Sequence, residues 1–152
     1  MIRSGPEGGT LPAALIAFAI DGQEFCLDVK FIMAILNPAE KRTYKINFLD
    51  DESRIEYWDG EYLMIDFMPQ LKLRKLGPEA GKRLVLVEYK NCKRAFWVDR
   101  VLDVIVRNVG NGEVFTFEAT EGSPIFSGHV QFDGRSFWLL DPDKMLAIPV
   151  EA

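Results

Sequence analysis

Apolar and polar residues follow one another in short runs along most of the chain, and turn-forming residues separate the runs. One phrase occurs three times: an apolar residue, Asp-Gly, a polar residue and an apolar run closed by Asp. The copies are IDGQEFCLD at 20–28, WDGEYLMID at 58–66 and FDGRSFWLLD at 132–141. Asp-Gly suits the centre of a type I′ turn because glycine takes positive φ without steric cost. The phrase therefore predicts three β-hairpins whose structural turns contain Gly22, Gly60 and Gly134.

The strands that follow the second and third turns are apolar at successive positions. Residues 62–65 have the sequence YLMI, and residues 137–140 have the sequence FWLL. A strand of an open sheet on water would alternate, so consecutive apolar residues indicate that both faces are covered. We therefore expect a barrel or sandwich whose outer face is buried against a second unit.

The rest of the chain also indicates strands, with one helical exception. The run VKFIMAIL at 29–36 is compatible with a strand, a helical turn, or one after the other. Residues 83–89 and 94–107 predict strands around a turn at 90–93, and the basic segment 69–83 is the best internal boundary. Asp-Pro at 141–142 suits the N-cap and first position of a short helix that ends before Pro149. The sequence thus predicts an all-β fold in two strand clusters with a short C-terminal helix.

Composition narrows the class of protein. The chain has 152 residues and a net charge of −5, and this acidity argues against binding to duplex nucleic acid. Residues 1–13 are expected to form a flexible tail, and no segment has the roughly 20 apolar residues of a membrane helix. Cys26 and Cys92 are far apart in sequence and are expected to be free buried thiols, which suits a cytoplasmic location; a disulfide between them is the alternative.

Catalytic chemistry has no candidate in this sequence. The single histidine, His129, excludes multi-histidine zinc sites and is expected to be a structural strand residue. No G-x-S-x-G motif, phosphate-binding loop or G-x-G-x-x-G motif occurs. Asp28, Asp66 and Asp141 recur at strand ends, where turn and capping roles are expected. We therefore predict no catalytic residue, no metal, no cofactor and no enzyme activity.

Four stretches, taken in order, resemble one known family. They are FAIDGQEFCLDV at 18–29, GEYLMIDF at 60–67, FWVDRVLDVI at 96–105 and FSGHVQFDGRSFWLLDPDKML at 126–146. Their order and spacing are similar to those of the CheW-like domain, the adaptor that couples bacterial chemoreceptors to their histidine kinase. The resemblance implies a single domain at 14–152 built of two small five-stranded β-barrels packed around a shared apolar centre. It places the first barrel at roughly 14–75 and the second at roughly 82–146, and it allows strand exchange between them.

The resemblance also implies a partner-binding surface, and this sequence departs from the family there. The family usually has N-L-R-G where residues 57–60 are YWDG, so Asp59 replaces a cation. The family's V-x-E-I contact stretch matches residues 32–35, where Ala34 replaces an acidic residue. The partner-binding residues implied by the resemblance are Ile32, Ala34, Ile35, Tyr57, Trp58 and Asp59.

The resulting hypothesis is a non-enzymatic adaptor that binds proteins through exposed apolar barrel surfaces. The expected partners are the CheW-like regulatory domain of a histidine kinase, a chemoreceptor tip, or another scaffold of a chemosensory or motility pathway. The alternative is an OB-type barrel that binds single-stranded nucleic acid by aromatic stacking. The basic segment LKLRKL at 71–76 and the pair Tyr57-Trp58 support this alternative, but Glu56 and Asp59 beside the pair oppose it.

Overall fold

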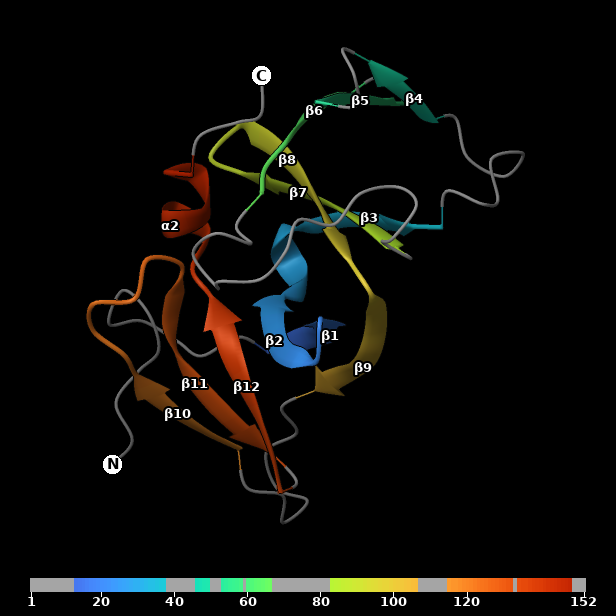
Figure 1. The fold of residues 1–152 in the computed structure, drawn as a ribbon. Helices are drawn as coiled ribbons and strands as arrows, with labels where there is room; N and C mark the ends of the chain where they lie inside the picture. The colour runs from blue at the N-terminus through green and yellow to red at the C-terminus, as the bar shows by residue number, and fades with distance from the viewer. Residues whose placement is uncertain are drawn as a thin grey trace.

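The computed structural model describes residues 13–37, 46–49, 53–58, 60–66, 83–106, 115–132 and 134–148. The predicted tail, apart from Ala13, and the predicted linker at 69–82 lie outside this part of the chain. The described residues form two six-stranded sheets (Figure 1). Sheet A has the order β10-β11-β12-β2-β1-β9, formed by Phe115–Ala119, Phe126–Phe132, Arg135–Leu140, Gln23–Asp28, Ala14–Ile20 and Arg100–Val106. Sheet B has the order β3-β7-β8-β6-β5-β4, formed by Ile32–Leu36, Arg83–Tyr89, Cys92–Val98, Gly60–Met64, Arg54–Tyr57 and Ile46–Leu49.

Each sheet takes strands from both halves of the chain. In sheet A, β2 pairs in parallel with β12, and β1 pairs with β9. In sheet B, β8 pairs in parallel with β6, and β7 pairs with β3. The sheets are therefore not divided at the linker into strands before residue 75 and strands after residue 82. Figure 1 shows the result, with β1 and β2 near the centre of the molecule.

The apolar residues of β1 explain this central position. Phe18 and Ile20 belong to a large core cluster that also contains Leu84–Val87 of β7 and Ala95–Val98 of β8. Leu15 and Ala17 point the other way along the same strand and belong to a smaller cluster. A strand that is apolar on both faces must be covered on both, and β1 is covered by sheet B on one side and by sheet A's own interior on the other.

The two strands that were predicted to be covered on both faces behave differently. In β6 and the residue that follows it, Tyr62, Met64 and Ile65 are buried and Leu63 is half-buried, so the prediction is confirmed at three of the four positions. In β12, Phe137, Leu139 and Leu140 are buried, but Trp138 is 39% exposed. The outer face of β12 is thus open at this tryptophan, and the prediction is wrong at that position.

Two of the three predicted turns are confirmed. Asp21 and Gly22 have φ of 50° and 84° and join β1 to β2. Gly134 has φ of 73° and lies between the paired residues Phe132 and Arg135, while Asp133 lies outside the described residues. Positive φ at these glycines is the conformation that a type I′ turn requires.

The predicted turn at Gly60 is wrong by one residue. Gly60 pairs with Tyr57 as the first residue of β6, so the turn precedes Gly60 and contains Trp58, with φ of 52°. The far end of the hairpin has the same register, since the Met64 amide donates to the Ser53 carbonyl at 2.9 Å. Gly60 has a different use: a Cβ there would lie 3.2 Å from Lys93 Nζ and from Tyr62 Cε1. The glycine thus permits close packing and does not supply the turn.

The helical elements agree with the sequence. The run at 29–36 contains both alternatives, since the 3₁₀-helix η2 at Val29–Phe31 precedes β3. The helix α2 spans Pro142–Leu146, and its N-cap Asp141 accepts a hydrogen bond from the Asp143 amide at 2.9 Å. The all-β fold with two packed units and a short C-terminal helix is confirmed. Each sheet has six strands among the described residues, one more than the five expected for each barrel.

Candidate interaction surfaces

The first predicted contact stretch lies in β3, at one edge of sheet B. Ile32 pairs with Val87 and Ala34 pairs with Leu86, so Met33 is the extra residue of a β-bulge. Met33 is 53% exposed, whereas Ile32, Ala34 and Ile35 are half-buried and pack against the large core cluster. Met33 is therefore the side chain that β3 presents to solvent. Sequence reasoning missed it because a run of apolar residues does not reveal where a bulge turns one of them outward.

The second predicted stretch is the turn between β5 and β6. Trp58 is 60% exposed, and Tyr57 is half-buried against the large core cluster. The two rings meet edge to face with centroids 6.0 Å apart. Asp59 lies outside the described residues. The side chain of Trp58 is thus displayed at the tip of the hairpin.

The structure does not join these two stretches along the sheet. β3 is an edge strand, β5 is next to the opposite edge, and β7, β8 and β6 lie between them. Ile32, Ala34 and Ile35 share one strand, and Tyr57 and Trp58 share one turn. We therefore treat Met33 with its strand and Trp58 with its turn as two separate surfaces.

Acidic residues surround the aromatic turn. Glu56 and Glu61 are exposed, Arg54 Nη1 lies 2.9 Å from Glu61 Oε1, and Asn47 Nδ2 donates to Glu56 Oε1 at 3.1 Å. Single-stranded nucleic acid is bound by aromatic stacking inside a positively charged groove. The carboxylates beside Trp58 are the wrong charge for that ligand.

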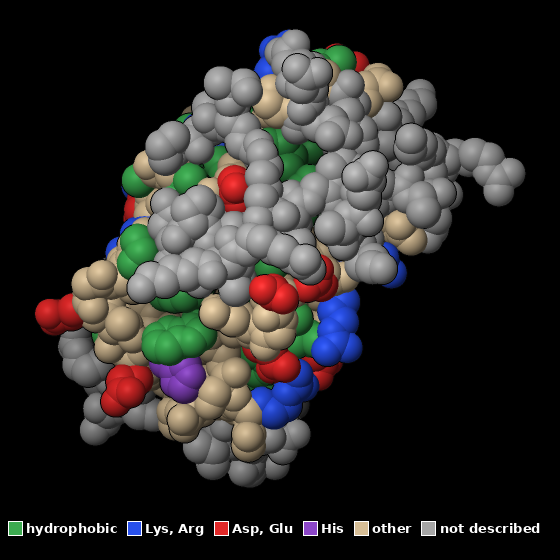
Figure 2. Space-filling model, viewed as in Figure 1, with side chains coloured by type: hydrophobic (Ala, Val, Ile, Leu, Met, Phe, Trp, Pro, Cys, Tyr) green, Lys and Arg blue, Asp and Glu red, His purple; other side chains and the backbone are tan. Residues whose placement is uncertain are grey.

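A third exposed aromatic group lies on the outer face of sheet A. Trp138 stacks on Phe126 with centroids 5.4 Å apart, and the His129 ring lies 4.8 Å from the Trp138 ring. Glu118 is the cross-strand neighbour of His129. Figure 2 shows the single histidine beside hydrophobic side chains on this face, with acidic side chains nearby. His129 lies in β11 as expected, and its ring contacts an aromatic group.

The carboxylates and thiols that could take part in chemistry either cap helices or are free thiols. Asp28 Oδ1 accepts from the Lys30 amide at 3.0 Å, so Asp28 and Asp141 have the capping roles expected of them. Cys26 and Cys92 are both free, and burial raises the pKa of the Cys26 thiol to about 12. That thiol is protonated at neutral pH and is a weak nucleophile.

Within the described residues, no group of three or more His, Cys, Asp or Glu side chains is arranged to hold a metal ion. Nor is any helix in this part of the chain long and apolar enough to span a membrane.

Comparisons with known proteins give one family and one fold. The family model described as CheW-like domain matches residues 14–149. Among solved structures, the scaffolding protein TtCheW from Thermoanaerobacter tengcongensis is similar, with a TM-score of 0.64 and 16% sequence identity. This likeness covers 86% of the present chain and 90% of that protein, and at such low identity it shows the fold alone. No curated protein matches the chain.

Proposed function

Since the chain belongs to the CheW-like domain family, we propose that it is a non-enzymatic adaptor in chemotaxis-type signal transduction. In this proposal it binds the regulatory domain of a histidine kinase, a chemoreceptor tip or another chemosensory scaffold. These partners act in the cytoplasm, so the proposal implies that location. Trp58 is the observation that carries the proposal.

The conformation and exposure of Trp58 both cost folding free energy. It has φ of 52°, a left-handed conformation that costs a residue with a Cβ about 1–2 kcal/mol. It also leaves 60% of a large apolar side chain in water. A tryptophan with such a backbone and such exposure is poorly explained by folding, and tryptophan is among the residues that most often anchor protein interfaces. We therefore assign the tip of the β5–β6 hairpin to partner contact, with Met33 of β3 as a separate contact.

The departures from the family bear on the choice of partner. Asp59 replaces the usual cation beside Trp58, and Ala34 replaces an acidic residue in β3. A carboxylate beside an anchor repels an acidic surface and favours a basic one, because complementary charge governs specificity. We therefore propose that the Trp58 surface has been redirected to a partner with a basic contact patch.

Titration calorimetry against the purified regulatory domain of the organism's own histidine kinase tests the proposal. Trp58→Ala is expected to weaken binding about tenfold or more, since removal of an interface anchor commonly costs ~2 kcal/mol or more. Trp138→Ala is the matched control, because it removes another exposed tryptophan from the other sheet. Asp59→Arg is expected to weaken the same complex and to improve binding to a conventional receptor tip. Equal affinity of wild type and Trp58→Ala for every candidate partner would refute the assignment.

A further inference from the structure

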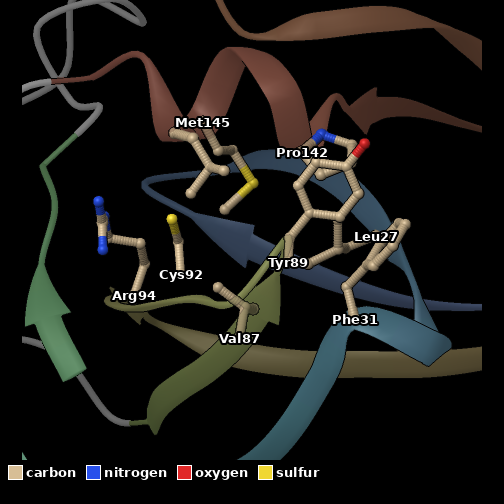
Figure 3. Close-up of a pocket in the computed structure, with 9 residues that line it drawn as sticks. Leu27, Phe31, Val87, Tyr89, Cys92, Arg94, Pro142 and Met145 are labelled. Atoms are coloured by element: carbon tan, nitrogen blue, oxygen red, sulfur yellow. The ribbon is translucent and has the colours of Figure 1, made fainter. Parts of the chain in front are cut away.

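A shallow apolar groove lies where η2, β7, β8 and α2 meet (Figure 3). Its floor includes Leu27, Val87 and Met145, all of which belong to the large core cluster. Its empty volume is about 260 Å³, part of which is open to solvent. Because this volume includes open solvent and little of it is enclosed, an apolar side chain of a bound segment would rest on the groove and not fill a cavity.

Two aromatic rings form one wall of the groove. Phe31 of η2 and Tyr89 at the end of β7 meet edge to face with centroids 5.0 Å apart. Figure 3 shows both rings on the side of the groove opposite Cys92 and Arg94. Because η2 leads directly into β3, which pairs with β7, the wall is held in place before any ligand arrives.

The rim is cationic on a chain that is acidic overall. Lys30 Nζ lies 5.1 Å from the centroid of Phe31, and Lys90 Nζ lies 5.2 Å from the centroid of Tyr89. Both lysines are well exposed, at 70% and 64%. Arg94 lines the groove as a third cation. The net charge of the whole chain is −5, so this local excess of positive charge is a distinct feature of the surface.

Two carboxylates partly balance these cations. Asp28 Oδ2 lies 3.8 Å from Lys30 Nζ, a long and weak contact. Asp143 is closer, since its Oδ1 lies 2.8 Å from Lys90 Nζ and its Oδ2 accepts from the Tyr89 hydroxyl at 3.2 Å. The hydrogen bond to Asp143 raises the pKa of Lys90, so the ammonium stays charged at neutral pH. Asp143 thus holds the place that a partner's carboxylate would take.

We propose that this groove binds a segment of a partner protein in which one apolar anchor residue is flanked by carboxylates. The anchor rests on the groove between the aromatic wall and Met145, and the flanking carboxylates contact Lys30 and Lys90. A basic segment would meet three cations and only two carboxylates at the same rim, and a purely polar segment would leave the apolar floor uncovered. This surface goes beyond the adaptor assignment and does not use Trp58.

Four five-residue peptides test the chemistry: Asp-Glu-Phe-Asp-Glu, Lys-Arg-Phe-Lys-Arg, Asp-Glu-Ser-Asp-Glu and Ser-Gly-Phe-Ser-Gly. Each is titrated into the ¹⁵N-labelled protein while amide chemical shifts are followed. The first peptide is expected to bind saturably with a Kd of about 1 mM or tighter. Its largest shifts are expected at Phe31, Tyr89 and Met145, and added salt should weaken it. Stronger binding of the basic peptide, shifts at other residues, or no saturable binding of the first peptide would overturn the proposal.

Charge variants of the whole protein sharpen the test. The double variant Lys30→Gln/Lys90→Gln is expected to weaken the acidic apolar peptide about fivefold, and Asp143→Asn to tighten it about threefold, because the competing carboxylate is gone. Arg100→Gln is the matched control, since it removes one exposed cation from β9 of sheet A. Trp58→Ala should leave peptide binding unchanged, so this surface and the adaptor assignment can fail separately. Unchanged affinity in both the lysine variant and Asp143→Asn would refute the role of the rim.

Discussion

The first and second hairpins share one sequence phrase but use it differently. In the β1–β2 hairpin, Asp-Gly forms the turn, and the Asp21 amide donates to Asp99 Oδ2 at 2.6 Å. In the β5–β6 hairpin, the turn comes one residue earlier and contains Trp58. The first hairpin lies inside sheet A, with β12 and β9 as its neighbours, whereas the second includes β5, which lies beside the edge strand β4 of sheet B.

The residues of the first turn suit the fold, whereas Trp58 in the second turn is a residue that the fold only tolerates. The first turn has the residues that its conformation favours, and its strands supply fully buried rings such as Phe18 and Phe25. The second turn places a large aromatic side chain in a left-handed conformation at the surface. Strained residues of this kind cluster at functional sites, where the surrounding structure holds them in place. The comparison therefore predicts two opposite results. Removal of a buried aromatic residue from the first hairpin should mainly lower stability, whereas removal of Trp58 from the second should mainly weaken partner binding.

The largest expected effect is on stability in the first hairpin. Phe18 is fully buried and contacts the rings of Phe25 and Phe96 at 5.1 and 5.6 Å. Phe18→Ala is expected to lower the free energy of unfolding by about 3–5 kcal/mol, because it removes apolar contacts and leaves a cavity. Urea denaturation of Phe18→Ala beside Trp58→Ala measures the contrast. The Trp58 variant should change stability by no more than about 0.5 kcal/mol, as is usual for surface substitutions. Equal losses in the two variants would remove the distinction between the hairpins.

The next effect compares the two glycines of the shared phrase. Gly22 has φ of 84° and no neighbour within 4 Å of an added Cβ, so Gly22→Ala should cost about 1–2 kcal/mol through backbone strain alone. At Gly60 no positive φ is required, and the closest atoms to a Cβ are the flexible end of Lys93 and the ring of Tyr62. Gly60→Ala should therefore cost less than about 1 kcal/mol. Gly134→Ala is the control and should resemble Gly22→Ala, since Gly134 has φ of 73° and open space. Thermal or urea unfolding that ranked Gly60→Ala as the most damaging would contradict this account of the turn.

The sequence predicted the kinds of element well because local chemistry determines them. The Asp21-Gly22 turn, the Asp141 cap with Pro142, and the buried apolar residues of β6 all have local causes, and each is seen in the structure. The local pattern could not predict the order of the strands within each sheet. The parallel pairs β12–β2 and β6–β8 join residues more than 30 positions apart, and nothing in either segment specifies its partner.

The candidate sites show the same limit at the level of single side chains. The pattern marked residues 32–35 as apolar, but a bulge in the edge strand decides that Met33 is the exposed residue. The register of β5 on β6, which pairs Tyr57 with Gly60, decides that Trp58 lies in the turn. The groove beside Tyr89 brings together residues from η2, β7, β8 and α2, whose proximity depends on the whole topology. Pairing between strands far apart in sequence therefore decides which side chains are exposed together. The local sequence pattern predicts only that those residues are apolar or polar.

The smallest effect on stability is also the sharpest test of the comparison. Asparagine tolerates positive φ better than tryptophan and is favoured in type I′ turns. Trp58→Asn should therefore raise the free energy of unfolding by about 0.5 kcal/mol, because it relieves strain and removes an exposed apolar surface. The variant also removes the edge-to-face contact with the Tyr57 ring, whose centroid lies 6.0 Å away. The same variant should weaken the complex with the kinase regulatory domain as strongly as Trp58→Ala does. Urea denaturation and calorimetry on one preparation measure both quantities. A variant that is less stable than wild type, yet binds as well, would show that Trp58 is retained for folding and that the turn is not a contact surface.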